Sequence, residues 1–176
     1  MALVVEDGTG RDDAESYISL AAFKTYCDRH GHSYGGKSDP EIEQALRRAT
    51  QWLDARYAAR FCGYRISEDQ ALALPQSGLI DRGGYALRHD AIPTRVQQAT
   101  AEAAVRELAS PRSLQPDVTP GKVVKGARVE GAVDVEYAIG SEVVRGQLPT
   151  LPVVDGILAP LFPRPRSPYS GRAERA

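Results

Sequence analysis

The clearest pattern of apolar and polar positions in the chain predicts a helix over residues 38–60. Apolar residues recur there at helical spacing, and most arginines lie outside the apolar stripe. Ser38 and Glu41 supply a capping box, and Pro40 fits the first turn. The stripe that we expect to face the core consists of Ile42, Ala45, Leu46, Ala49, Leu53 and Tyr57.

Weaker helical patterns occur at other places along the chain. Apolar spacing predicts helices over residues 19–31 and 93–110, and a short helix over residues 152–159. A second capping box at residues 67–70 predicts a helix of about two turns, which Pro75 ends. These segments make the fold class mainly α, a small helical bundle.

A change in pattern after residue 110 predicts a β-hairpin over residues 122–138. Prolines interrupt the preceding linker, and then Val133, Val135 and Tyr137 alternate with Asp134 and Glu136. An isolated two-stranded hairpin is barely stable in water. We therefore expect the hairpin to lie on the helices of its own chain or on a neighbouring subunit.

The chain divides into segments of different character. Residues 1–18 form an N-terminal segment, residues 19–110 a helical core, residues 111–150 a linker with the hairpin, and residues 151–176 a short helix with a C-terminal arm. Prolines in the last segment bar a regular helix. The sequence therefore predicts extended N- and C-terminal arms around the bundle.

Composition fits a folded soluble protein, with 42% hydrophobic and 26% charged residues. No window approaches the ~18 apolar residues of a membrane span, so we expect no membrane partner and no signal peptide. Net charge is −1, so no global field attracts nucleic acid. The charge is uneven, however, because the N-terminal segment is acidic and the C-terminal arm is basic. Such ends favour docking onto a partner.

One motif matches the phosphate-binding P-loop pattern. Residues 31–38 read GHSYGGKS, with Lys37 at the lysine position. The pattern binds phosphate when a buried strand precedes the loop, whereas here an amphipathic helix is predicted before it. We interpret the segment as a helix–helix connection and expect no nucleotide cofactor.

Cys27, His30, His32 and Cys62 are residue types that could bind zinc. Structural zinc sites normally have paired ligands at both ends, and Cys62 stands alone. We expect Cys27 to be a reduced core residue and the protein to hold no metal. His89–Asp90 lacks a nucleophile motif beside it. With no catalytic residues evident, we expect the protein not to be an enzyme.

Aromatic and basic residues mix in the region around residue 55, as they do in single-strand binders. Trp52, Tyr57 and Tyr64 occur there among several arginines. Trp52 and Tyr57 lie on or beside the apolar stripe, where burial in the core is the usual outcome. We therefore favour a core helix with a solvated basic face, and keep single-stranded-DNA binding as the alternative.

The order of several stretches resembles the head–tail connector, or adaptor, proteins of tailed bacteriophages. The likeness covers most of the chain from Val4 to about Phe162. Some members of that group carry the label DnaT-like single-stranded-DNA-binding protein. The stretches that carry the likeness are VVEDGTG at 4–10, AESYISL at 14–20, RAT at 48–50, LDARY at 53–57, QALALP at 70–75, SG at 77–78, AIP at 91–93, VVK at 123–125, PVVD at 152–155 and PL at 160–161.

The resemblance implies a structural virion protein, made in the host cytoplasm, that forms a ring, usually dodecameric, between the portal protein and the tail or its stopper. Genomic DNA would pass through the lumen without specific binding. From the residues themselves we expect the hairpin positions Val133, Val135 and Tyr137 to form the subunit interface. The arm residues that we expect to bind the portal are Arg164, Arg166, Tyr169 and Arg172.

Overall fold

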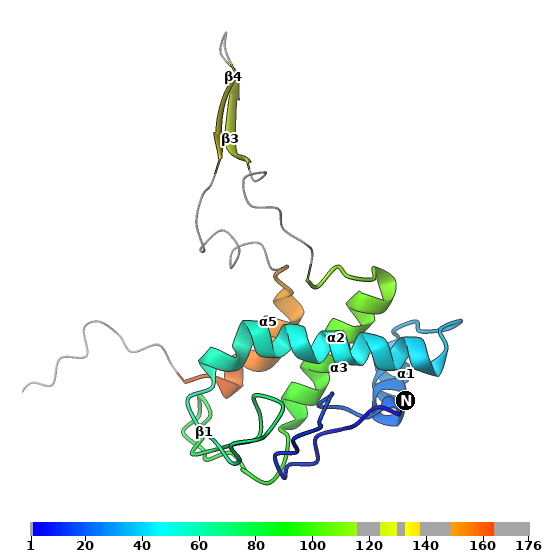
Figure 1. The fold of residues 1–176 in the computed structure, drawn as a ribbon, viewed down its shortest axis with the longest axis vertical. Coiled ribbons are helices and arrows are strands. Elements are labelled where there is room, and N and C mark those ends of the chain that lie inside the picture. The colour runs from blue at the N-terminus through cyan, green and yellow to red at the C-terminus, as the bar shows by residue number, and fades with distance from the viewer. Residues whose placement is uncertain (1, 116–123, 130–132, 138–148, 164–176) are drawn as a thin grey trace, which may run out of the picture.

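The computed structural model describes residues 2–115, 124–129, 133–137 and 149–163. It is mainly helical, with a small antiparallel hairpin, as the sequence predicts (Figure 1). The C-terminal arm from Arg164 onward, including Arg166, Tyr169 and Arg172, lies outside the described residues. No helix of the described part is long and apolar enough to span a membrane.

Helix α2 (Asp39–Tyr57) is the central element of the fold. The Glu41 carboxylate accepts the Ser38 N–H at 2.9 Å, which completes the predicted capping box. The predicted stripe is buried along the whole helix, and Trp52 is buried with it. A 3-10 turn, η1 (Ala58–Arg60), extends the helix to the predicted end.

Helix α1 (Leu20–His30) begins and ends where the sequence indicates. The Ser19 hydroxyl accepts the Ala22 N–H at 3.2 Å, and Phe23 and Cys27 are buried. Gly31 ends the helix with a φ of 71°, the left-handed conformation that glycine adopts without strain. The residues of the P-loop motif therefore connect two helices, and the helix–helix interpretation is confirmed.

Helix α3 (Thr94–Ala109) packs along α2 and α5 (Figure 1). Its buried face is rich in alanine, which lets the helix axes approach closely. Near its end the buried Glu107 carboxylate accepts the Arg48 Nε–H at 2.6 Å and the Arg112 N–H at 2.7 Å. This clasp fixes the point where the chain leaves the helices toward the hairpin.

Helix α5 (Pro152–Leu158) and the 3-10 turn η2 (Ala159–Leu161) return the chain to the core. The sequence predicts this short helix to within one residue. Phe162, directly after η2, stacks on Tyr57 at 6.0 Å between ring centroids and also contacts Phe61. Leu161 and Phe162, close to the end of the described residues, are therefore part of the core.

The N-terminal segment is extended but does not stand apart from the helices. Tyr17 and Ile18 are buried, and Val5 forms an isolated bridge with Ser16. The buried Glu6 carboxylate accepts backbone N–H groups of Gly8 and Gly10, both at 2.9 Å. The Glu6 carboxylate of this acidic segment thus stabilises the loop that follows it.

The helix predicted from Ser67 is wrong. Gln70 is buried there, and its side-chain oxygen accepts the Ile66 N–H at 3.0 Å while its amide nitrogen donates to the Leu72 carbonyl at 2.8 Å. The Ala71 N–H donates to the Arg11 carbonyl at 2.9 Å. These bonds use backbone groups that a helix would need, so the segment folds as a loop.

The predicted hairpin consists of β3 (Val124–Val129) and β4 (Val133–Tyr137), which pair antiparallel. Val129 faces Val133, Ala127 faces Val135, and Val124 faces Tyr137 after a register irregularity. Directly opposed residues share one face of a hairpin. The three positions expected at a subunit interface therefore lie on one face of β4; whether they form that interface stays a prediction.

Candidate nucleic-acid interface

The aromatic residues near residue 55 separate into buried and exposed groups. Trp52 is fully buried and Tyr57 is 1% exposed, whereas Tyr64 is 80% exposed. Trp52 packs edge-on against Tyr57, with ring centroids 5.8 Å apart. The prediction that Trp52 and Tyr57 belong to the core is confirmed, so a base cannot stack on either ring in this fold.

Exposed aromatic residues instead gather on one set of loops, residues 61–92, which we call the loop lobe. Tyr64 and Tyr85 are 80% and 76% exposed, and Ile80 is 55% exposed. Apart from Val153, these are the large apolar side chains with high exposure in the described part of the chain. Exposed aromatic side chains are the usual stacking platforms for unpaired bases.

Short β pairings give the loop lobe its shape. Strands β1 (Tyr64–Arg65) and β2 (Gln76–Ser77) pair antiparallel, with Tyr64 opposite Ser77. An isolated bridge joins Ile80 to Ala86, directly beside Tyr85. The Asp81 carboxylate accepts the Gly83 and Tyr85 N–H groups at 2.8 and 2.9 Å. Both exposed tyrosines are thus carried by a hydrogen-bonded backbone.

A buried polar network attaches the loop lobe to α2. The Asp54 carboxylate accepts the Tyr17 hydroxyl at 2.6 Å and the Ala73 N–H at 2.9 Å, and the Tyr17 oxygen accepts the Leu74 N–H at 3.1 Å. Burial raises the pKa of the Asp54 carboxyl, although both hydrogen bonds oppose the rise. The network joins three distant parts of the chain, so the lobe has a fixed position on the helices.

Arginines lie within the loop lobe and directly before it. Arg60 lies over the Phe162 ring at 4.0 Å from its centroid, and its side chain is 50% exposed. Arg65 is next to Tyr64 in β1 and donates to the Gln70 carbonyl. The Arg82 N–H donates to the Pro160 carbonyl at 2.8 Å, which holds the lobe against η2.

The loop lobe itself is not a basic patch. It contains three arginines and four carboxylates. The Arg88 guanidinium forms an ion pair with the Asp90 carboxylate, at 2.7 Å. Hydrogen bonding to Arg88 lowers the pKa of Asp90 to about 2, so this pair stays charged at neutral pH. The described lobe therefore has little net positive charge of its own, and Arg60, directly before it in η1, is a half-exposed cation 3.8 Å from the Asp155 carboxylate.

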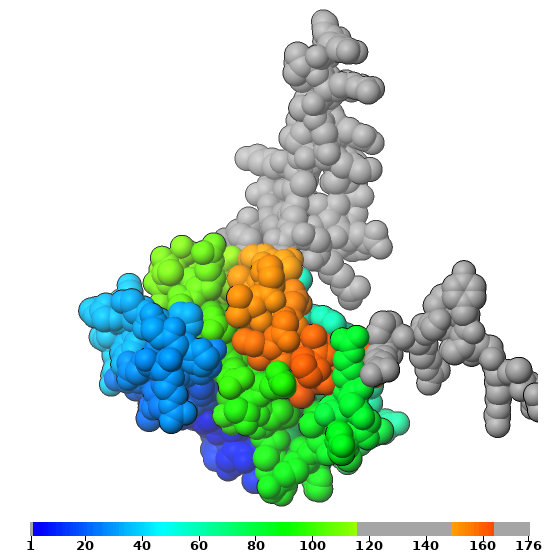
Figure 2. Space-filling view, turned by 180° about the vertical axis from the view of Figure 1, so that it is seen from behind, coloured from blue at the N-terminus to red at the C-terminus, as the bar shows by residue number. Residues whose placement is uncertain are grey.

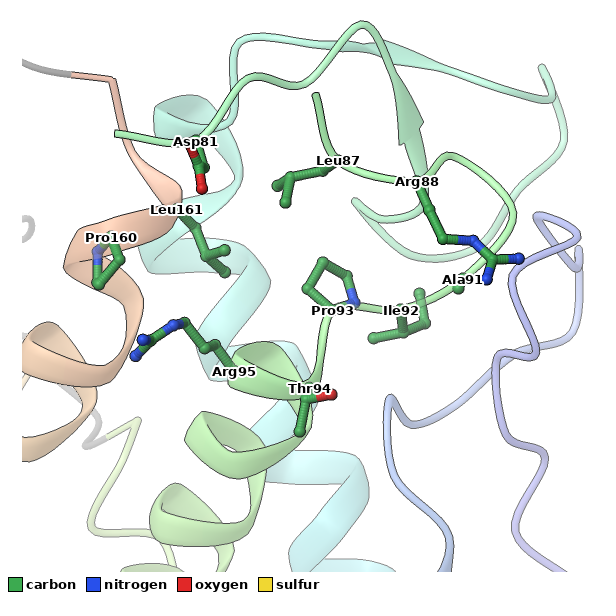
Figure 3. Close-up of a pocket in the computed structure, with 10 residues that line it drawn as sticks. All are labelled: Asp81, Leu87, Arg88, Ala91, Ile92, Pro93, Thr94, Arg95, Pro160 and Leu161. Atoms are coloured by element: carbon green, nitrogen blue, oxygen red, sulfur yellow. The ribbon is translucent and has the colours of Figure 1, made fainter. Parts of the chain in front are cut away.

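A pocket of about 440 Å³ lies between the loop lobe and the start of α3 (Figure 3). Leu87, Ile92 and Leu161 line it with apolar side chains. Figure 3 shows Arg88 and Arg95 on opposite sides of this pocket, with their guanidinium groups directed outward. The pocket thus adds an apolar hollow beside the lobe, flanked by cations.

The residues considered for zinc lie in different environments. Cys27 is buried in the core and Cys62 is exposed, while His30 and His32 take part in a stack with Tyr26. Burial raises the pKa of the Cys27 thiol to about 11. His32 Nε2 lies 3.0 Å from the Glu102 carboxylate. Among the described residues, no group of three or more His, Cys, Asp and Glu side chains is arranged to hold a metal ion.

Among the exposed side chains of the loop lobe, the mixture of aromatic and basic residues in the sequence indicates Tyr64 but not Ile80 or Tyr85. A signal for Tyr85 was present, because it follows Gly83–Gly84 in a turn between polar residues, and an aromatic residue in such a turn has little core to enter. Ile80 gave no such signal.

Comparison with known proteins gives a family. A family model described as "Putative DnaT-like ssDNA binding protein" matches residues 1–176. No curated protein and no solved structure matches. The match supports the single-stranded-DNA alternative of the sequence analysis, and it provides no support for the head–tail connector. The chain belongs to the DnaT-like single-stranded-DNA-binding protein family.

Proposed function

We propose that this chain binds single-stranded DNA through the loop lobe. Bases stack on Tyr64 and Tyr85, and arginines at the edge of the lobe contact the phosphates. The exposure of these two tyrosines on a hydrogen-bonded backbone carries the proposal. Family membership supports the same ligand.

The C-terminal arm supplies much of the positive charge in this proposal. Phe162 stacks against Arg60, and the chain continues from there through Pro163 to the arm. The arm contains four arginines and one glutamate. Its first arginine, Arg164, follows Phe162 by two positions in the sequence.

The expected binding is weak and independent of sequence. Net charge is −1, and the loop lobe is close to neutral, so long-range attraction is small. Stacking on an aromatic side chain contributes ~1–3 kcal/mol per base and tolerates every base. Because few phosphates are neutralised, the affinity should also fall less steeply with salt than that of strongly basic binders.

Fluorescence anisotropy of a labelled oligo(dT) tests this proposal. Wild type should bind at low salt, and the Tyr64→Ala/Tyr85→Ala double variant should bind much more weakly. The matched control is Tyr64→Phe/Tyr85→Phe, which keeps both rings and should retain affinity. Equal affinity of wild type and the alanine double variant would show that the two tyrosines of the loop lobe do not bind the DNA.

A second candidate function is the one implied by the resemblance in the sequence, a ring-forming connector of a virion. The hairpin favours it, because β3 and β4 form a two-stranded sheet of their own, and such a sheet needs an additional surface for stability. In this candidate the chain assembles with itself and contacts a portal protein and a tail protein, and the C-terminal arm docks on the portal.

Electron microscopy separates the two candidates. Purified protein mixed with the portal protein of its own phage should form a stacked ring if the connector candidate holds, and deleting residues 163–176 should weaken that attachment. If the chain stays separate from the portal at micromolar concentration while binding oligo(dT), the connector candidate fails.

A further inference from the structure

A second hollow, which we call the α1–α3 hollow, lies between these two helices. It has a volume of about 350 Å³ and is lined by Tyr26, Arg29 and His30 from α1 and by Gln97 and Gln98 from α3. Figure 2 shows α1, in blue, and α5, in orange, on the two sides of α3 on one face of the molecule. The volume of the hollow is in the range of sites that bind small ligands.

The aromatic wall of the α1–α3 hollow is held in place. The rings of Tyr26 and His30 stack, with their centroids 4.1 Å apart and their planes 25° from parallel. The Tyr26 hydroxyl donates to the Glu102 carboxylate at 2.7 Å, which fixes the inner ring of the stack. His30 is exposed, so the outer ring is accessible from solvent. An ordered aromatic stack with an accessible ring is a surface on which an unpaired base can stack.

The polar groups of the hollow suit a nucleotide as well. Arg29 supplies a positive charge, and none of the described residues that line the hollow is a carboxylate. The Gln97 and Gln98 amides each offer a donor and an acceptor, which are the groups that the edges of bases bind. A cation for a phosphate and amides for a base thus lie beside the aromatic stack.

The α1–α3 hollow continues from the site on the loop lobe. Thr94, the first residue of α3, lines both the hollow and the pocket of Figure 3. Asp81 lines the same pocket, and its carboxylate accepts the N–H of the exposed Tyr85 at 2.9 Å. Tyr85, the pocket and the hollow therefore follow one another over the start of α3, with Arg95 beside the pocket and Arg29 in the hollow.

We propose that single-stranded DNA continues from the loop lobe across Thr94 into the α1–α3 hollow, where a base stacks on His30 and Arg29 contacts a phosphate. This inference rests on the proposed function and adds a second segment to the path of the strand. The first segment is formed by loops and the second by helices. A short oligonucleotide bound at the two tyrosines should leave the hollow empty, whereas a longer one should fill both.

Fluorescence anisotropy with two strand lengths tests this proposal. Labelled oligo(dT) of about four and about twelve nucleotides falls within the site sizes of known single-strand binders. His30→Ala removes a stacking surface and should raise the dissociation constant of the longer strand on the order of fivefold or more. It should leave the binding of the shorter strand unchanged. His30→Phe keeps an aromatic ring at this position and should retain the affinity for the longer strand.

Salt dependence gives an independent readout for Arg29. Arg29→Gln removes one phosphate contact, so the slope of log affinity against log salt for the longer strand should become shallower by ~0.7. The matched control is Arg106→Gln, which removes the same charge from an exposed position near the other end of α3 and should not change the slope. Because Arg29 and His30 are both exposed, their variants should keep the helical circular dichroism of wild type.

The failure of this inference can be told apart from the failure of the proposed function. If Tyr64→Ala/Tyr85→Ala weakens the binding of both strands while Arg29→Gln and His30→Ala weaken neither, the strand does not enter the hollow and only this inference is wrong. Equal losses for both strand lengths in the Arg29 and His30 variants would indicate a separate site and would also overturn the continuous path. If wild type binds neither strand, both are wrong.

Discussion

Helix α2 and the loop lobe both place aromatic residues beside arginines, but they use them differently. In α2, Trp52 and Tyr57 face inward, and Arg48 pairs with a buried carboxylate. In the lobe, Tyr64 and Tyr85 face solvent on short β pairings. An aromatic and basic composition is thus a weak guide to DNA binding until the fold shows which rings are exposed.

The largest expected difference between the two regions is in stability. Trp52→Ala removes a fully buried ring and should lower the free energy of unfolding by ~3–5 kcal/mol. Tyr85→Ala removes an exposed ring and should change it by less than ~0.5 kcal/mol. Urea denaturation followed by circular dichroism measures both, and similar losses would show that the two regions do not differ as described.

The next difference concerns binding. Tyr64→Ala and Tyr85→Ala should each weaken oligo(dT) binding by ~1–3 kcal/mol, because each removes one stacking platform. Trp52 is the only tryptophan of the chain and is buried, so its fluorescence should change little when DNA binds. Titration with simultaneous anisotropy and tryptophan emission tests both expectations. Strong quenching of Trp52 would point to a stacking site on α2.

A smaller effect should appear at high pH. Burial, with a hydrogen bond to Asp155, raises the pKa of Tyr57 to about 12. The folded state then keeps a proton that the unfolded state loses above its ordinary pKa of ~10, so stability falls as pH rises between these values. Tyr57→Phe should make this alkaline loss shallower. Urea midpoints from pH 9 to 12 measure it, and an unchanged slope would contradict the assignment to Tyr57.

The smallest effect is expected in the P-loop motif. Lys37 lies in the loop between α1 and α2, where its amine is 3.9 Å from the Glu41 carboxylate. Lys37→Ala should change stability by less than ~0.5 kcal/mol, because this exposed pair is weak. Calorimetry with ATP and magnesium should show no binding. A micromolar affinity that is lost in the variant would restore the nucleotide-binding reading.

The sequence predicted the helices well where local signals decide them. Ser19 and Ser38 cap their helices as expected, and Gly31 ends α1. Such signals act within one turn of helix and need no knowledge of the rest of the fold. The hairpin could be predicted as well, because the alternation of apolar and polar residues in its second strand is also a local signal.

Contacts between distant parts of the chain limited the prediction elsewhere. The capping box at Ser67 failed because Gln70 enters the core of a loop that also bonds to Arg11 in the N-terminal segment. Tyr57 and Tyr64 are seven positions apart and cannot be separated by composition. One packs on Phe162 from the other end of the chain, and the other has no such cover, so only tertiary structure distinguishes them.

The central claim, that the loop lobe contacts single-stranded DNA, is tested most directly by photo-cross-linking. Oligo(dT) with 5-bromodeoxyuridine is irradiated with the intact protein, and the modified peptides are identified by mass spectrometry. We expect adducts at Tyr64 or Tyr85. The Tyr64→Phe and Tyr85→Phe variants should change the mass of the adduct but still bind the oligonucleotide at these positions. Adducts confined to α2 or to the hairpin, or no adduct under conditions where anisotropy reports binding, would contradict it.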